Sequence, residues 1–245
     1  MSVLLLSSCI QVSAPYTKLK SANLRLKSTL ESLKQWIKIA PTQKIVICDG
    51  SNYDFSNDCK NLFPQHKIEC LNFRNDEYAV AKYGKGYGEG EIIKYALKKS
   101  KFLMNEDFFI KCGGQIYIKN FKKIINSWNG LFECDLILKR NILRIPIIPH
   151  QVDTRFYIVN KKFYIKNFLN RYQKVRDQEG NFLEHEFFNA LLNINHKVGK
   201  YFISEKPEIN GISGTYGSKY STNKVYWLKK KLTHFLKGFI VKSIY

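Results

Sequence analysis

The segment Lys44-Ile45-Val46-Ile47-Cys48-Asp49-Gly50-Ser51-Asn52 indicates a strand and the turn that follows it. Its apolar run is short and is followed at once by turn-forming residues, which is the pattern of a buried strand. The strand is predicted over Lys44 to Cys48, with Asp49 at its end. What precedes and follows this strand along the chain indicates the kind of sheet that contains it.

The segments on either side of it alternate between strand and helix. Val3 to Val12 is apolar and is predicted to be a buried strand. From about Ala22 to Ala40 apolar residues recur at helical spacing, and Pro41 ends this helix. A further short strand is predicted over His66 to Leu71.

The alternation continues through the rest of the chain. Further strands are predicted over 108–112, 134–138, 156–159 and 201–203, and further helices from Ile92 and over 116–128, 163–172 and 182–192. Strands that alternate with helices indicate an α/β fold with a mostly parallel sheet flanked by helices. Residues 1–222 are expected to form this domain, followed by a separate helical tail over 223–245.

Ligands of such sheets bind where the parallel strands end at their carboxyl edge. Three loops are therefore expected to lie together: Asp49–Asn52, a glycine cluster over Gly84–Gly90, and Gly113-Gly114.

The composition points to an anionic partner. The chain of 245 residues holds 40 basic and 20 acidic residues, a formal net charge of +20, and 44% of it is apolar, which excludes global disorder. Genomic drift explains lysine in place of arginine but not the shortage of acids. The six cysteines form no Cys-x-x-Cys pair and are expected to be reduced and mostly buried, and no zinc site is predicted.

Three glycine-containing loops are candidates for binding phosphate. Lys85-Gly86-Tyr87-Gly88-Glu89-Gly90 precedes a predicted helix, whose N-terminus favours anions. Lys111-Cys112-Gly113-Gly114-Gln115 follows a strand, and the loop 211–220 combines glycines and hydroxyls, including Ser213 and Gly214, with Lys219. The alternatives are a flexible surface turn, a simple strand-to-helix turn and a linker, respectively.

Few acids are available for proton transfer. Glu184 opens a predicted helix on the same side as an apolar residue, Phe188, so its carboxylate is expected to face the fold and act as a general base. Asp153, just before a strand, is the second candidate. The alternative for Glu184 is capping of the helix N-terminus, and His185 is expected on the surface or behind the site.

The tail is a basic amphipathic helix. Residues 224–245 hold six lysines and no acid, and Trp227, Leu228, Leu232, Phe235, Leu236, Phe239 and Ile240 recur at helical spacing. It either packs on the domain as an ordinary C-terminal helix or lies on an anionic membrane surface.

Taken in order, these segments resemble bacterial GT-A-type glycosyltransferases of surface-polysaccharide synthesis, over residues 3 to 220. The carriers are the opening strand, Arg25 and Ser32-Leu33-Lys34, Ile45 to Ser51, Lys85 to Glu89, Ile110 to Gln115, Asp153 to Phe156, Glu184 to Glu186, and Gly211 to Gly214. The resemblance implies a Rossmann-type sheet. It also implies donor binding by Arg25, Asp49, Lys85, Gly86, Tyr87, Gly88, Glu89, Lys111, Gly113, Gly114, Gln115, Ser213, Gly214 and Lys219, and catalysis by Glu184 or Asp153.

One departure from the family is clear. GT-A enzymes usually carry an Asp-x-Asp motif that binds a divalent metal and the donor diphosphate, whereas the matching region here is Lys111 to Gln115. This calls a requirement for Mg²⁺ or Mn²⁺ into question. Lys85, Lys111 and Lys219 are expected to stabilise the departing phosphate instead, and a CMP-activated donor with one phosphate also fits.

The resemblance implies transfer of a sugar from a nucleotide-sugar donor to a hydroxyl of a growing surface polysaccharide, such as capsule or lipopolysaccharide, or of a lipid-linked glycan. The expected location is cytoplasmic, peripheral to the inner membrane through 224–245. Two other classes remain open at this point: a nucleic-acid-binding basic α/β protein, and a non-catalytic membrane-associated assembly protein. The first is disfavoured because the lysines are spread over the whole chain and no nucleic-acid motif is present.

Overall fold

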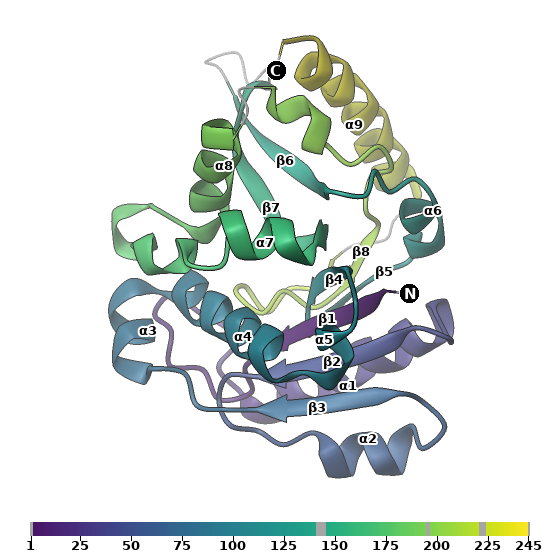
Figure 1. Ribbon diagram of the computed structural model, residues 1–245, viewed down its shortest axis with the longest axis vertical. Coiled ribbons are helices and arrows are strands. Elements are labelled where there is room, and N and C mark those ends of the chain that lie inside the picture. The colour runs from purple at the N-terminus through teal and green to yellow at the C-terminus, as the bar shows by residue number, and fades with distance from the viewer. Residues whose placement is uncertain (1, 141–145, 195–196, 221–223, 245) are drawn as a thin grey trace.

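The residues Lys44–Asp49 form a strand, β2, within a six-stranded sheet of order β3-β2-β1-β4-β7-β6 (Figure 1). The computed structural model describes residues 2–140, 146–194, 197–220 and 224–244. The other strands are β1 (Val3–Ser8), β3 (Ile68–Asn72), β4 (Phe108–Gly113), β6 (Phe132–Arg140) and β7 (Pro146–Asn160). β1 to β4 run parallel, while β7 is antiparallel to β4 and β6 to β7.

Helices cover both faces of this sheet, because successive residues of its central strands point to opposite sides. Val3 and Leu5 pack into one core, with α4 (Lys85–Lys99), α5 (Lys101–Met104), α7 (Lys161–Asn167), α8 (Leu183–Ile194) and α9 (Lys224–Ile244). Leu4 and Leu6 pack into the other, with α1 (Ala22–Ile39), α2 (Ser56–Leu62) and α6 (Phe121–Asn126). The predicted fold class, α/β with a mostly parallel sheet flanked by helices, is confirmed, and a C-terminal helix is present.

The prediction of a helix over 116–128 is wrong. Ile116–Ile118 is a short strand, β5, paired with β8 (Ile209–Gly211), and the helix α6 begins only at Phe121. The carbonyl of Ile116 accepts hydrogen bonds from Ser32 Oγ at 2.7 Å and Trp36 Nε1 at 3.0 Å, which fixes the segment against α1. Gly211 has φ +105°, and a Cβ there would lie 2.2 Å from the carbonyl oxygen of Gln115, so only glycine fits this pairing.

Two other predictions on the C-terminal half are also wrong in part. The late strand at 201–203 is replaced by a 3₁₀ helix, η3 (Val198–Tyr201), and a single bridge between Phe202 and Cys134. The helix over 163–172 divides into α7 and a second 3₁₀ helix, η1 (Arg171–Lys174).

The tail helix α9 packs beside η3 and β7, at the end of the molecule marked C in Figure 1. Its inner side carries the buried His234 and Val241, and a Cβ at Gly238 would lie 3.2 Å from the ring of Phe202. The predicted boundary at 222/223 falls outside the described residues. Among the helices described, none combines the length and apolarity needed to cross a bilayer.

Candidate functional site

A cavity of about 420 Å³ opens at the carboxyl edge of the parallel strands. It lies where the strand order reverses, between β1 and β4, which is the position at which open α/β sheets bind ligands. Its walls come from the loop after β1, the first turns of α4, the end of β4, the middle of β7, the start of α8 and the loop 212–220. Of the three loops expected to meet at this edge, the glycine cluster and Gly113-Gly114 line the cavity.

The glycine pair lets two backbones approach closely. The N–H of Gly114 donates to the carbonyl of Ser7 at 2.7 Å, and a Cβ on Gly114 would lie 2.9 Å from that oxygen. Gln115 follows, and its Nε2 donates to Ser28 Oγ at 2.7 Å. The cavity floor is therefore backbone of β1 and β4, held by α1.

Arg25 ties the walls together. Its Nε donates to the carbonyl of Cys9 at 2.6 Å, and its Nη1 donates to the carbonyls of Leu19 and Gly214 at 3.2 and 3.1 Å. Burial lowers the pKa of this guanidinium. The predicted donor-binding residue Arg25 thus lines the cavity, and it also fixes the loop after β1 against the loop that contains Ser213 and Gly214.

Lys111 places a buried ammonium beside the cavity. Its side chain is 1% exposed, it forms an ion pair with Glu89 of α4, and it donates to the carbonyl of Thr154 at 2.7 Å. The ring of Tyr157 lies 5.8 Å from the same nitrogen. A buried ammonium with three such contacts is held in one position.

Arg155 and Asp153 form a second charge pair on β7. Asp153 accepts from Arg155 Nε at 2.8 Å and Nη2 at 2.5 Å, and the guanidinium also lies over the ring of Tyr220 at 5.4 Å. Although burial opposes it, the charge and hydrogen bonds of Arg155 lower the pKa of Asp153 and so keep it ionised. This pairing argues against Asp153 as the general base and makes it the residue that orients Arg155.

Glu184 lines the same end of the cavity, at the start of α8. Its Oε1 accepts from Thr154 Oγ1 at 2.9 Å, and within the described ranges the carboxylate takes part in no ion pair. The predicted general base is thus half-buried, oriented and free of a neutralising cation. Behind it, His185 contacts Gln151, with 2.8 Å between the two Nε2 atoms.

The glycine cluster is not a loop, because α4 already begins at Lys85. The backbone N–H of Lys85, the first of the helix, donates to Asp177 Oδ2 at 2.9 Å. The side chain of Asp177 therefore caps this end of the helix. Burial raises the pKa of Asp177 to about 6. Lys85 Nζ instead reaches Thr215 Oγ1 at 3.1 Å and joins α4 to the loop 212–220.

Four of the predicted donor-binding residues do not line the cavity: Asp49, Gly86, Tyr87 and Lys219. Asp49 is fully buried and accepts from the backbone N–H groups of Ile10, Ser51 and Tyr53, so it shapes the loop after β2. Gly86 and Tyr87 face the core, where Tyr87 packs against Tyr172. Lys219 is exposed on the loop.

Sequence reasoning missed several lining residues, among them Asn75, Thr154, Arg155 and Tyr220. Arg155 stood in a quoted motif but was not assigned a role, since only the fold shows that it pairs with Asp153. Asn75 carries no pattern in the sequence that distinguishes it from a loop asparagine.

The side chains that line the cavity do not form a site for a divalent metal. The described residues contain no group of three or more side chains able to hold one. Two of the three cavity carboxylates, Glu89 and Asp153, are already paired with Lys111 and Arg155. A cation would have to displace both partners to bind there.

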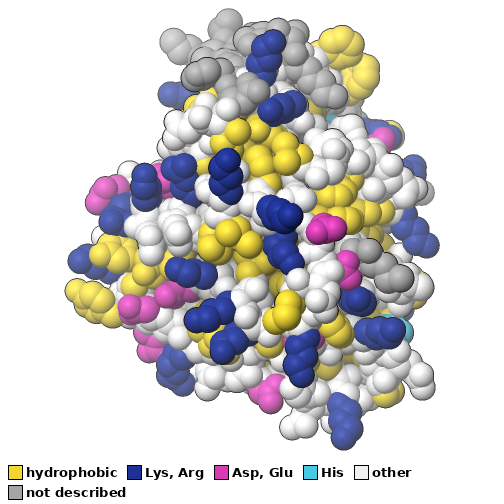
Figure 2. Space-filling view, in the orientation of Figure 1, with side chains coloured by type: hydrophobic (Ala, Val, Ile, Leu, Met, Phe, Trp, Pro, Cys, Tyr) yellow, Lys and Arg dark blue, Asp and Glu magenta, His cyan; other side chains and the backbone are white. Residues whose placement is uncertain are grey.

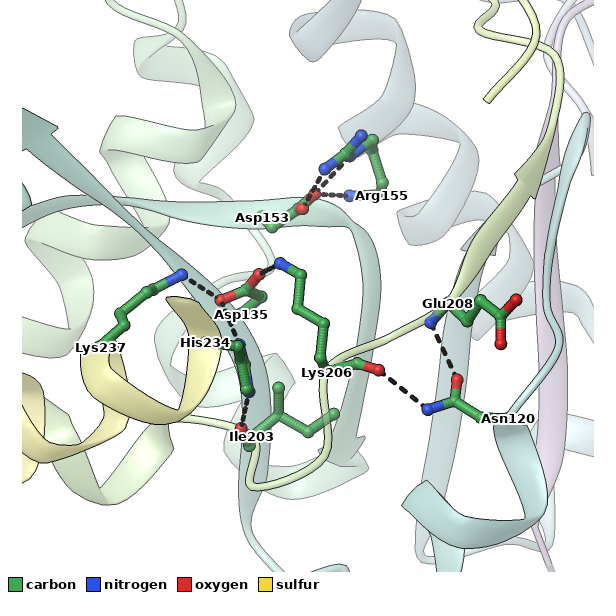
Figure 3. A network of polar contacts seen from close by, with 9 residues as sticks. All are labelled: Asn120, Asp135, Asp153, Arg155, Ile203, Lys206, Glu208, His234 and Lys237. Carbon is green, nitrogen blue, oxygen red and sulfur yellow. Dashed lines mark hydrogen bonds and ion pairs between the residues drawn. The ribbon is translucent and has the colours of Figure 1, made fainter. Parts of the chain in front are cut away.

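A buried charge network joins β6 to the tail helix α9 (Figure 3). Asp135 of β6 forms ion pairs with Lys206 and with Lys237 of α9, and His234 Nδ1 lies 3.7 Å from its carboxylate. His234 Nε2 donates to the carbonyl of Ile203 at 2.9 Å. Burial lowers the pKa of His234 to about 4, so the imidazole is neutral near pH 7. The tail helix is therefore held by the ion pair of Lys237 with Asp135 and by the hydrogen bond from His234 to the carbonyl of Ile203.

Comparison with known proteins finds likeness in fold only. The sequence matches no family model, and it matches no curated protein. Among solved structures, one is a putative nucleotide-diphospho-sugar transferase from Desulfovibrio desulfuricans, at 13% identity and a TM-score of 0.45 over 79% of this chain and 77% of that one. The mannosyltransferase Ktr4p from S. cerevisiae, solved with GDP, has 10% sequence identity and a TM-score of 0.43, over 75% of this chain and 63% of that one. The galactosyltransferase LgtC, solved with donor and acceptor sugar analogs, has 8% sequence identity and a TM-score of 0.47, over 78% of this chain and 70% of that one.

Proposed function

We propose that this protein is a glycosyltransferase that moves a sugar from a nucleotide-sugar donor to an acceptor hydroxyl. The observation that carries the proposal is the composition of the cavity at the β1/β4 switch point. The cationic side chains Lys85, Lys111 and Arg155 line it together with backbone glycines, and so does Glu184, whose carboxylate forms no ion pair within the described residues. Cations suit a phosphate leaving group, and a carboxylate suits proton removal from a hydroxyl.

The cations differ in what they offer the phosphate. Lys111 is 1% exposed and paired with Glu89, and Arg155 is paired with Asp153, so the charges of both cations are largely offset. Lys85 is exposed and hydrogen-bonded to a neutral hydroxyl, that of Thr215, so its charge is the most available to a ligand. The protein's own cations thus take the role that a metal has in many phosphate sites.

In the transfer step, the acceptor oxygen attacks the anomeric carbon as the bond from that carbon to the phosphate oxygen breaks. The electron pair of that bond leaves with the phosphate, next to Lys85 and Arg155. Glu184 takes the proton of the acceptor hydroxyl. Its hydrogen bond from Thr154 occupies one oxygen and leaves the other for this proton.

We further propose that α9 places the enzyme on an anionic bilayer, where lipid-linked acceptors of surface polysaccharide, such as bacterial capsule or lipopolysaccharide, are elongated. Large apolar side chains on its outer face are exposed: Leu228, Leu232, Phe235 and Leu236 at 55 to 64%. They recur at helical spacing and lie among exposed lysines, including Lys229 and Lys231. An apolar stripe bordered by cations matches the interface of an anionic leaflet.

The membrane proposal predicts sedimentation with vesicles. The wild-type chain is expected to pellet with vesicles that contain an anionic lipid, less so in high salt, and weakly with purely zwitterionic vesicles. Replacing Leu232 and Leu236 with serine should abolish pelleting, whereas the same change at the exposed Leu24 and Leu62 should not. Equal pelleting of both double variants would contradict the assignment of α9, and self-association of the wild type without lipid would point to helix pairing.

Nucleic-acid binding is less well supported. Figure 2 shows lysine and arginine side chains scattered singly over the visible face, with acidic residues between them, and no continuous basic track on that face. Backbone recognition of nucleic acid uses such a track.

Donor binding is the first experiment. Thermal unfolding is measured with UDP-, GDP-, dTDP- and CMP-sugars, each with Mn²⁺ and with EDTA. One class is expected to raise Tm by roughly 5 to 10 °C at a hundredfold excess over Kd, because the ligand binds only the folded state. The shift should persist in EDTA, since protein cations hold the phosphate. No shift with any donor would refute the proposed function, and a shift seen only with Mn²⁺ would refute the metal-independent site.

A further inference from the structure

Asn75 has a buried side chain whose hydrogen-bonding capacity is not used. It lines the cavity and is 8% exposed. Among the described residues its Oδ1 has no hydrogen-bond partner, and its Nδ2 has only a 3.5 Å contact with the carbonyl of Gly88. Buried amides are almost always paired, so an unpaired one on a residue of the cavity wall has hydrogen-bonding capacity to offer a ligand.

Two glycines from separate segments leave room for this carboxamide. A Cβ on Gly50, after β2, would lie 2.7 Å from both Nδ2 and Oδ1 of Asn75, and a Cβ on Gly88, in α4, would lie 2.7 Å from Nδ2. The backbone N–H of Asn75 donates to the carbonyl of Gly50 at 2.8 Å, which holds the residue in place. Any larger residue at either glycine would occupy the space of the amide.

The surroundings of Asn75 differ from the charged end of the cavity. Val80 and Ile92 also line the cavity, and their side chains lie close to the positions of Gly88 and Gly50, respectively. Arg155 is on β7, three strands from β2 in the sheet, which is roughly 14 Å at the usual strand spacing. The β1/β4 switch point, where phosphates bind, lies between the two ends.

We infer that Asn75 binds the nucleobase of the donor, by pairing its carboxamide with a base edge that presents a hydrogen-bond donor beside an acceptor. The inference rests on the proposed function. With phosphate at the switch point and the transfer groups at the β7 end, the nucleoside occupies the β2/β3 end. There Val80 and Ile92 provide apolar contact for the base. Rotation about the Cβ–Cγ bond, a soft torsion in asparagine, turns Oδ1 toward the ligand.

The test is calorimetric titration of the full-length protein with UDP, dTDP, GDP, CDP, ADP and inorganic pyrophosphate. Wild type is expected to bind one of these nucleoside diphosphates more tightly than pyrophosphate, because the base adds contacts that pyrophosphate lacks. Asn75→Ala should lower the affinity for the preferred nucleotide about tenfold or more. The affinity for pyrophosphate should stay unchanged, because pyrophosphate has no base. Asn75→Asp keeps the size of the side chain but removes the N–H group that donates a hydrogen bond. It should lower the affinity for the nucleotide by a similar factor. Asn167→Ala, on α7 away from the cavity, is the matched control and should change neither.

The possible outcomes separate the inference from the proposed function. Unchanged nucleotide affinity in both Asn75 variants, or an equal loss of pyrophosphate affinity, overturns the role of Asn75 and leaves glycosyl transfer standing. Wild type that binds no nucleotide overturns both. If Asn75→Ala fails to fold, as shown by its thermal unfolding, the isosteric Asn75→Asp decides.

Discussion

Glu184→Gln is expected to lower the rate of sugar transfer about a thousandfold while donor affinity stays at the wild-type value. Glutamine keeps the carbonyl oxygen that accepts from Thr154 Oγ1, so the wall of the cavity is preserved. It cannot take the proton of the acceptor hydroxyl, so the transition state loses its base. Single-turnover transfer and equilibrium binding of the donor are measured on the same preparation.

The matched control for this prediction is Glu186→Gln. Glu186 lies on the same helix and is buried, but it accepts from Asn181 Nδ2 at 2.9 Å and does not line the cavity. Its substitution should leave the single-turnover rate unchanged. Wild-type turnover in Glu184→Gln would remove Glu184 from the mechanism, and an equal loss in both variants would assign the effect to α8 as a whole.

Asp135→Ala is expected to destabilise the protein by about 3 to 5 kcal/mol. The carboxylate is buried between Lys206 and Lys237 with His234 beside it, and its removal leaves two partly buried ammonium groups without a counter-charge (Figure 3). The free energy of unfolding is measured by urea titration at neutral pH.

Two further variants show whether the loss is electrostatic. The triple variant Asp135→Leu, Lys206→Met, Lys237→Met replaces the charges with apolar side chains and should recover much of the stability, because no buried charge is left unpaired. Asp107→Ala, at an exposed acid, should change stability by no more than about 0.5 kcal/mol. If Asp135→Ala behaves like Asp107→Ala, the network does not hold α9 to the domain.

The sequence predicts the N-terminal half of the fold well and the segment after β4 poorly. The helix over Ala22–Ile39 and the strand over Lys44–Asp49 follow from apolar spacing. The helix buries one face, and the strand contains a continuous apolar run. The strand Ile116–Ile118 does not follow from such spacing, because it is defined by a partner more than ninety residues later, at Ile209–Gly211. Pairing at such separation leaves no local pattern.

The site is predicted at the level of loops and less well at the level of individual side chains. Gly113-Gly114 and Glu184 line the cavity because strand ends and helix starts meet at one sheet edge. The glycine cluster misleads, because its glycines serve helix packing: a Cβ on Gly90 would lie 2.1 Å from Tyr172. Ion pairing is equally invisible in sequence, so Asp153 looks like a base until Arg155 is seen to hold it.

The way α9 is attached has a practical consequence for anyone who trims the chain. Its outward apolar stripe makes the last two dozen residues an obvious candidate for deletion to improve solubility during purification. The same residues supply Lys237 to Asp135 and His234 to the carbonyl of Ile203, and deletion would leave that buried carboxylate with Lys206 as its remaining ion-pair partner in this network. Polar replacements at Leu228, Leu232 and Leu236 remove exposed apolar side chains and keep the contact between Lys237 and Asp135. These substitutions are therefore a better route to a soluble preparation than deletion of the helix.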